Sequence, residues 1–205
     1  MNANWNSVPS SENIKYLTED ELRRFFAVIK ANKKEIIRKR DLCLFSLMLA
    51  YGLRSAEAIS LKLEHINLSE RQIFVKRKKR KNYGRWFNIS DDNIKLIKSW
   101  LKVRARLRPS PYLFLSAQTR QDEALSADQL YFISRKYGNI AGIPRMHPHV
   151  LRHTCGVTLA KHNFNAFAIR DRLGHSSLIS SLVYVELGGE DRINRDRKMD
   201  SALVV

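Results

Sequence analysis

Hydrophobic positions repeat at helical spacing through most of the chain. After an aperiodic polar start over residues 1–15, Thr18 and Glu21 form the pattern of a helix capping box, and apolar residues follow at intervals of three and four. Gly52 is suited to end a second helix, and Ser55 to cap a short third one. Further apolar periods predict helices from 90 to 103, from 126 to 133, from 148 to 162, from 167 to 173 and from 178 to 187.

Between the third and fourth predicted helices, the pattern changes to that of strands. Residues 73–75 and 86–89 are rich in β-branched and aromatic side chains, and a long basic turn joins them. They predict a hairpin with lysines at its tip. No fixed-length repeat or low-complexity linker divides the chain, so the expected fold class is α+β: one mainly helical domain with a small antiparallel β-hairpin or sheet.

The charge of the chain favours a polyanionic partner. The 205 residues hold 37 Lys and Arg against 20 Asp and Glu, a formal net charge of +17. Residues 71–108 alone contain fourteen basic residues but only two acidic ones, Asp91 and Asp92. Nucleic acid is the leading interpretation, ahead of a solvated basic face or a membrane-surface helix. No apolar run is long enough for a membrane span or a signal peptide, so a cytoplasmic, nucleoid-associated protein is expected.

Several short motifs carry the candidate chemistry. His149 and Arg152 stand three apart on a predicted helix, which puts both on one face, although such a pair alone is weak. The motifs, in chain order, are Gly52-Leu53-Arg54 followed by Glu57, His149-x-x-Arg152, Leu173-Gly174-His175, and Tyr184 nine residues after His175. Together with the basic hairpin, this series resembles the signature of the tyrosine recombinases, or phage integrase family.

The resemblance implies both the catalytic-domain fold of that family and a role for each motif. Arg54 and Arg152 carry planar forks suited to the non-bridging oxygens of a phosphate that gains charge during cleavage. Tyr184 would be the nucleophile, with His149 as a candidate base, because a tyrosine hydroxyl with a reference pKa of about 10 needs nearby cations or a base. His175 would donate to a non-bridging oxygen. No cofactor or metal ion is implied.

The remaining family residue, a hairpin lysine acting as general acid, has several candidates. Counting forward from Arg54 favours Lys78, whereas Lys76, Lys79 and Lys81 also lie near the turn.

Neighbouring residues allow two interpretations each. Glu57 would orient Arg54 or merely favour the start of a helix. Ser181, with Ser180, replaces threonines common in the family, where a hydroxyl would cap a helix. Trp86, Phe87 and Trp100 would contact DNA bases or, the favoured interpretation, belong to the core.

The predicted organisation is a flexible leader over 1–15, a catalytic domain over 16–187, and a tail over 188–205, for which packing in trans on a neighbouring subunit and a solvated end are both open. The resemblance covers the catalytic half of larger recombinases and is closest to compact invertases that switch bacterial fimbrial genes. It implies double-stranded DNA with inverted or direct repeat sites as the partner, a homotetramer on that DNA, and accessory DNA-bending proteins. Inversion controlling surface-gene phase variation is the specific hypothesis, and integration or excision of a mobile element is the alternative.

Hypotheses from other classes are weaker. A DNA-binding regulator without catalysis would not need Tyr184. A zinc protease is disfavoured because Val150 stands between His149 and His153 where such a site needs Glu. A metal-dependent nuclease lacks a convincing carboxylate cluster. Cys43 and Cys155 lie in apolar helical sequence and predict buried, reduced thiols.

Overall fold

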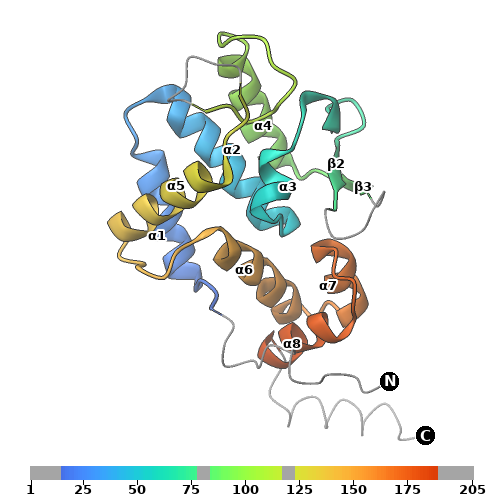
Figure 1. Cartoon of the computed structure of the whole chain (residues 1–205). Helices are drawn as coiled ribbons and strands as arrows, with labels where there is room; N and C mark the ends of the chain where they lie inside the picture. Colours follow the sequence, from blue (N-terminus) through green and yellow to red (C-terminus); the bar gives the residue numbers. More distant parts are fainter. Residues whose placement is uncertain (1–14, 78–83, 117–122, 189–205) are drawn as a thin grey trace, which may run out of the picture. The chain divides into compact units, whose positions relative to one another are not determined.

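A computed structural model describes residues 15–77, 84–116 and 123–188, which fall into two compact units (Figure 1). The first unit comprises residues 15–154, and the second begins at residue 155. The first contains α1 (Glu19–Lys30), α2 (Glu35–Tyr51), α3 (Ser55–Ile59), a 3-10 helix (Leu63–His65), β1 (Ile66–Asn67), β2 (Gln72–Lys76), β3 (Gly84–Asn88), α4 (Asp91–Arg104), α5 (Ala127–Ile140) and the start of α6 (Pro148–Lys161). The second contains the rest of α6, α7 (Ala166–Leu173) and α8 (Ile179–Gly188).

The α+β prediction is confirmed, and local capping explains where several helices begin. The Thr18 side chain accepts from the Glu21 backbone N–H, while the Glu21 carboxylate accepts from the Thr18 N–H at 2.9 Å. Ser126 and Gln129 make the same reciprocal pair at the start of α5. Each satisfies backbone donors that the first helical turn leaves without intrahelical partners, so these helix starts follow directly from the sequence.

Three details differ from the sequence predictions. Arg54 rather than Ser55 is the N-cap residue of α3, and the helix ends at Ile59. A short strand, β1, pairs antiparallel with β2, so the sheet has the order β1-β2-β3. Trp86 is 44% exposed and stacks at a tilt against Phe74, with ring centroids 5.3 Å apart. The core prediction is therefore wrong for Trp86, because it lies on the outer face of the sheet.

The core of the first unit forms around α2, which packs against α1 and α4 (Figure 1). Phe25 of α1, Phe45 of α2 and Tyr137 of α5 meet edge to face, with ring centroids 5.2–6.4 Å apart. Such aromatic pairs add about 0.5–1.5 kcal/mol each beyond the burial of their area. Phe87 and Trp100 are also buried, as predicted, and the indole N–H of Trp100 donates to a backbone carbonyl. The junction between α2 and α3 is joined to this packing, because Tyr51 and Leu53 belong to the same buried core.

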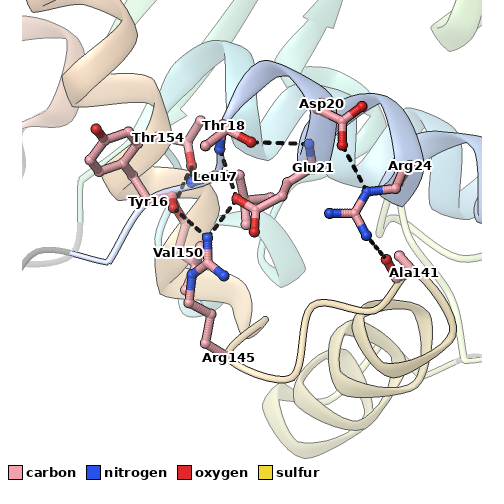
Figure 2. Close-up of polar contacts among 10 residues, drawn as sticks. All are labelled: Tyr16, Leu17, Thr18, Asp20, Glu21, Arg24, Ala141, Arg145, Val150 and Thr154. Atoms are coloured by element: carbon pink, nitrogen blue, oxygen red, sulfur yellow. Dashed lines mark hydrogen bonds and ion pairs between the residues drawn. The ribbon is translucent and has the colours of Figure 1, made fainter.

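A second set of contacts fastens the start of α1 to α6 (Figure 2). Arg145 donates to the Tyr16 carbonyl at 3.1 Å and pairs with Glu21 at 2.5 Å. The backbone N–H of Leu17 donates to Thr154 Oγ1 at 2.9 Å, and that hydroxyl donates onward to the Val150 carbonyl. The segment before α1 is thus tied to the helix that carries His149 and Arg152.

We expect Thr154→Val to lower the free energy of unfolding by about 1–3 kcal/mol, because valine keeps the shape but leaves the buried Leu17 N–H without its acceptor. Urea denaturation would measure the change. Thr158→Val, one turn later at an exposed position of the same helix, is the matched control and should shift stability by less than about 0.5 kcal/mol. Equal stability of Thr154→Val and the wild type would contradict a stabilising role for this contact.

Cys43 and Cys155 are buried and form no disulfide with each other, as predicted, and burial raises the pKa of the Cys43 thiol. Among the helices in the described ranges, none is long and apolar enough to cross a membrane.

Candidate active site

The α2–α3 junction presents the first arginine. Gly52 closes α2 in the left-handed conformation, with φ 56° and ψ 40°, which a residue bearing a β-carbon adopts only under strain. The next residue, Leu53, is buried, and Arg54 then begins α3 with a side chain that is 19% exposed. The tight turn therefore places Arg54 directly after a core residue, at the start of α3, with its side chain partly exposed.

Glu57 fixes the Arg54 guanidinium. The carboxylate is fully buried, and its Oε1 lies 2.9 Å from Arg54 Nη1. Its Oε2 accepts the Arg54 backbone N–H at 3.0 Å. Both sequence interpretations of Glu57 are thus correct, since the same carboxylate satisfies the helix start and orients the arginine. In the described residues, the remaining guanidinium donors of Arg54 make no hydrogen bond, which leaves this part of the fork available to an anion.

Arg77, which the sequence reasoning missed, also contacts Glu57. Its Nη1 lies 2.9 Å from Glu57 Oε2, its Nη2 donates to the Tyr51 carbonyl at 3.1 Å, and its side chain is 1% exposed. The alternation of strand residues could have revealed this buried position. Ile73 and Val75 face the core, so position 77, two residues further on, falls on the same side. A basic residue within a basic turn concealed that regularity.

Arg152 reaches the same junction from α6. The residue is 2% exposed, and its Nη1 donates to the Gly52 carbonyl at 2.5 Å. The α2–α3 turn is therefore held from two directions, by Arg77 at Tyr51 and by Arg152 at Gly52. The structure brings both sequence-predicted arginines to one turn, although they are almost a hundred residues apart in the chain. Two guanidinium groups anchored at one turn suit the recognition of a phosphate, because each can donate to phosphate oxygens in a planar, bidentate manner.

The histidines of α6 differ in their surroundings. His149 is exposed, whereas Arg152 is buried, and the His149 ring lies edge-on to His153 with centroids 4.8 Å apart. Burial lowers the pKa of His153 to about 4, with further lowering by His149, Arg152 and His147. His153 is consequently neutral at pH 7 and supports the His149 ring without adding charge.

Electrostatics within the junction favour an ionised Glu57. Burial opposes the charged form, but Arg77, the Arg54 backbone N–H and the Arg54 guanidinium outweigh it, so the pKa of Glu57 is lowered from its ordinary value. The carboxylate thus remains an acceptor for both arginines at neutral pH.

The second unit contains the predicted nucleophile. Tyr184 of α8 is 3% exposed, and its ring stacks on His175 with centroids 6.0 Å apart and an interplanar angle of 18°. His175 follows Gly174, which ends α7 in the left-handed conformation. The Nδ1 of His175 lies 2.8 Å from Ser181 Oγ, so Ser181 fixes the His175 ring. The sequence had instead suggested that this hydroxyl caps a helix. The nine-residue spacing therefore corresponds to direct ring contact.

Gly156 makes this arrangement possible. A β-carbon at this position would stand 2.6 Å from both Cδ1 and Cε1 of Tyr184, far inside van der Waals contact. Glycine is consequently needed for packing against the tyrosine ring, not for backbone freedom. The Cys155-Gly156 sequence had given no indication of this role.

We expect Gly156→Ala to lower the rate of any reaction at Tyr184 by about 100-fold, since a displacement near 1 Å at a reacting group has that order of cost. The measurement is the single-turnover rate of covalent attachment to DNA. Gly138→Ala is the matched control, because its β-carbon would meet Met146 Cβ at 2.3 Å in the core of the first unit. That variant should lose stability but, below its melting temperature, react at the wild-type rate. Equal rates in both variants would refute the packing argument.

Of the four candidates for the hairpin lysine, the described residues include one. Lys78, Lys79 and Lys81 lie outside the described residues, and Lys76 is an exposed residue at the end of β2. No group of three or more His, Cys, Asp or Glu side chains within residues 15–77, 84–116 and 123–188 is arranged to hold a metal ion.

Similarity to known proteins is extensive. The sequence profile of the phage integrase family matches residues 15–188. The type 1 fimbriae regulatory protein FimB of Escherichia coli K12 is 30% identical over 172 residues, which cover 82% of each chain. Tyrosine recombinase XerA of Pyrococcus furiosus is 32% identical over 173 residues, 84% of this chain and 57% of XerA. The crystal structure of XerH site-specific recombinase bound to difH substrate aligns with 93% of this chain and 55% of XerH, at TM-score 0.76 and 25% identity.

Proposed function

The chain belongs to the phage integrase family and is a tyrosine-type site-specific DNA recombinase, and we propose that it breaks and rejoins DNA through a 3′-phosphotyrosyl link at Tyr184. The observation that carries this proposal is that neighbouring side chains hold the signature residues in defined orientations. Tyr184 is stacked on His175, and Arg54 is oriented by a buried carboxylate. We propose residues 16–187 as the catalytic domain, and the family match over residues 15–188 supports this assignment.

In the proposed cleavage, the Tyr184 hydroxyl attacks the scissile phosphorus. A bond from the tyrosine oxygen to phosphorus forms, the bond from phosphorus to the 5′ oxygen breaks, and that oxygen leaves as a hydroxyl after gaining a proton. We propose His149 as the base that removes the tyrosine proton and Lys78 as the acid that protonates the leaving oxygen. Rejoining reverses these steps with the 5′ hydroxyl of a partner strand. Since the covalent link retains the energy of the phosphodiester bond, the reaction needs no ATP, and each proposed step uses side chains rather than a metal ion.

In the proposed transition state, positively charged side chains stabilise the negative charge on the phosphate. We propose that Arg54 and Arg152 bind the two non-bridging oxygens, on which charge accumulates, and that His175 donates to one of them. Within the described part of the chain, Arg54 keeps guanidinium donors that Glu57 does not occupy, and the Gly52 carbonyl orients Arg152. The formal charge of +17 provides a general attraction for the DNA backbone.

The biological reaction we propose is inversion of a DNA segment that controls surface-gene expression, in the manner of a fimbrial switch. Its support is the likeness to FimB, which extends over 82% of both chains. The partners would be double-stranded DNA with inverted repeat sites, further copies of the chain assembled as a tetramer, and DNA-bending proteins. The protein would act on chromosomal DNA in the cytoplasm.

Two linked experiments test this function. Sequencing of DNA junctions in cells that express the protein would identify the recombined sites, and inverted segments bounded by inverted repeats are expected. Junctions between a mobile element and new loci would instead indicate integration. A duplex carrying one such site, with a nick beside the scissile phosphate, should then trap a covalent protein–DNA adduct whose yield is unchanged by EDTA. Absence of an adduct with the wild-type protein would refute catalysis through Tyr184.

A further inference from the structure

We propose that Arg77 is a positioning residue for Arg54, which acts by sharing the Glu57 carboxylate and so preserves the positive charge that Arg54 presents to the phosphate. The inference rests on the proposed function of Arg54. Arg77 itself would touch neither DNA nor the reacting atoms. It would act through Glu57, from the buried side of the junction.

The geometry places Glu57 between two guanidinium groups. One carboxylate oxygen lies 2.9 Å from Arg54 Nη1, and the other lies 2.9 Å from Arg77 Nη1. The second oxygen also accepts the Arg54 backbone N–H. The carboxylate is therefore held from three sides and has little freedom to rotate, which in turn fixes the direction of the Arg54 fork.

Burial distinguishes the two arginines. The side chain of Arg77 is 1% exposed and that of Arg54 is 19% exposed, with Glu57 fully buried between them. Arg77 is further anchored by the Tyr51 carbonyl and lies over the Phe87 ring at 5.6 Å. Both terminal nitrogens of Arg77 are occupied, one by Glu57 and one by the Tyr51 carbonyl, so the binding of a ligand falls to Arg54.

The net charge of Arg54, Glu57 and Arg77 determines how strongly Arg54 attracts a phosphate. A buried Glu57 paired with Arg54 alone would make a neutral couple, and the arginine would attract a phosphate weakly. With Arg77 included, the three side chains carry a net formal charge of +1, in a site of low dielectric where each charge acts strongly. Glu57 can thus orient Arg54 without cancelling its attraction for the developing negative charge.

The first test compares single-turnover rates of adduct formation on a nicked site duplex. Arg77→Met should lower the rate by about 10- to 100-fold, the order typical for residues that orient a catalytic group, while DNA affinity changes by less than about threefold. Arg77→Lys, which keeps the charge, should recover part of the rate. Arg104→Met is the matched control: Arg104 is a buried arginine of the same unit that binds backbone carbonyls, and its loss should affect stability but not the rate of folded protein.

A double variant separates the proposed mechanism from a loss of structure. If Arg77 matters because Glu57 is charged, Glu57→Gln combined with Arg77→Met should react faster than Arg77→Met alone, since Arg54 then keeps its charge beside a neutral amide. A structural role predicts the reverse, because two buried contacts are lost. Should Arg77→Met fold poorly, Arg77→Gln replaces it in the same two comparisons, because glutamine also removes the charge but keeps a polar group beside Glu57.

A modified substrate gives the second test. A methylphosphonate at the scissile position lacks one anionic oxygen, so it depends less on arginine charge, and the deficit of Arg77→Met should shrink to less than about threefold on it. The same deficit on both substrates, or a wild-type rate for Arg77→Met, would overturn the inference. Failure of the proposed function is distinguishable, because the wild-type protein would then form no adduct at all.

Discussion

Tyr184→Phe is expected to abolish covalent attachment to DNA while leaving DNA binding intact. Phenylalanine retains the ring that stacks on His175 and packs on Gly156, and only the hydroxyl is lost. The rate should fall by more than about 10⁴-fold, the order observed when an enzyme loses its nucleophile. Denaturing gels of reactions on a nicked site duplex would measure the adduct, and fluorescence anisotropy would measure affinity for the intact duplex.

Tyr131→Phe serves as the control for the tyrosine substitution. Tyr131 of α5 is 48% exposed, so loss of its hydroxyl should change neither adduct formation nor stability. An adduct that persists in Tyr184→Phe would assign the nucleophile to another residue. An adduct lost in both variants would show that the assay responds to something other than the Tyr184 hydroxyl.

Arg54→Lys is the second substitution with a large expected effect. Lysine keeps the positive charge but cannot bind Glu57 with one nitrogen and a phosphate oxygen with others, because it carries a single ammonium group. The single-turnover cleavage rate should fall by about 100- to 1,000-fold, comparable to the loss of one preorganised donor at a developing oxyanion. The partly exposed site should tolerate the change, so the melting temperature should move little.

The specificity of that effect can be checked at Arg23, an exposed arginine of α1 that pairs with Asp20 at 3.8 Å. Arg23→Lys should react within about twofold of the wild type, as expected for an exposed ion pair of little energetic weight. If Arg54→Lys also retained nearly the full rate, binding of the phosphate by the Arg54 fork would be excluded.

The two substitutions also differ in what they report. Tyr184→Phe removes the atom that forms the covalent bond, whereas Arg54→Lys keeps the nucleophile and removes geometry from the anion site. A methylphosphonate substrate should therefore lessen the Arg54→Lys deficit but leave Tyr184→Phe inactive. Together with the Arg77 variants, these measurements would separate the chemistry of the nucleophile from the electrostatics that serve it.

Helix-capping residues and the periodic spacing of hydrophobic residues made much of the fold predictable. Thr18 and Ser126 each accept from a backbone N–H three residues ahead, and Gly52 takes a positive φ, so each signal acts within a few residues of itself. Ser55 shows where such local reasoning stops. Its hydroxyl suits a cap, but the buried Glu57 carboxylate captures the Arg54 backbone N–H and begins the helix one residue earlier.

The predictions for Trp86 and Ser181 were wrong for the same reason. Trp86 faces away from the core because its neighbour Phe87 takes the inward position on β3, and the register with β2 decides between them. Ser181 binds His175 because α7 and α8 pack together, which no local pattern encodes. In both cases, the decisive contact comes from a different element of the chain.

The sequence by itself determined the fold class, several of the helix caps, the identity of the signature residues and the spacing of His175 and Tyr184. These depend on short-range periodicity and on residue chemistry. Only the tertiary structure decided that Arg152 binds the carbonyl of Gly52, that Gly156 makes room for the Tyr184 ring, and that Arg77 shares the carboxylate of Glu57. Those contacts join residues 20 to 100 positions apart, because the free energy of burying and pairing charged or aromatic groups depends on packing between elements.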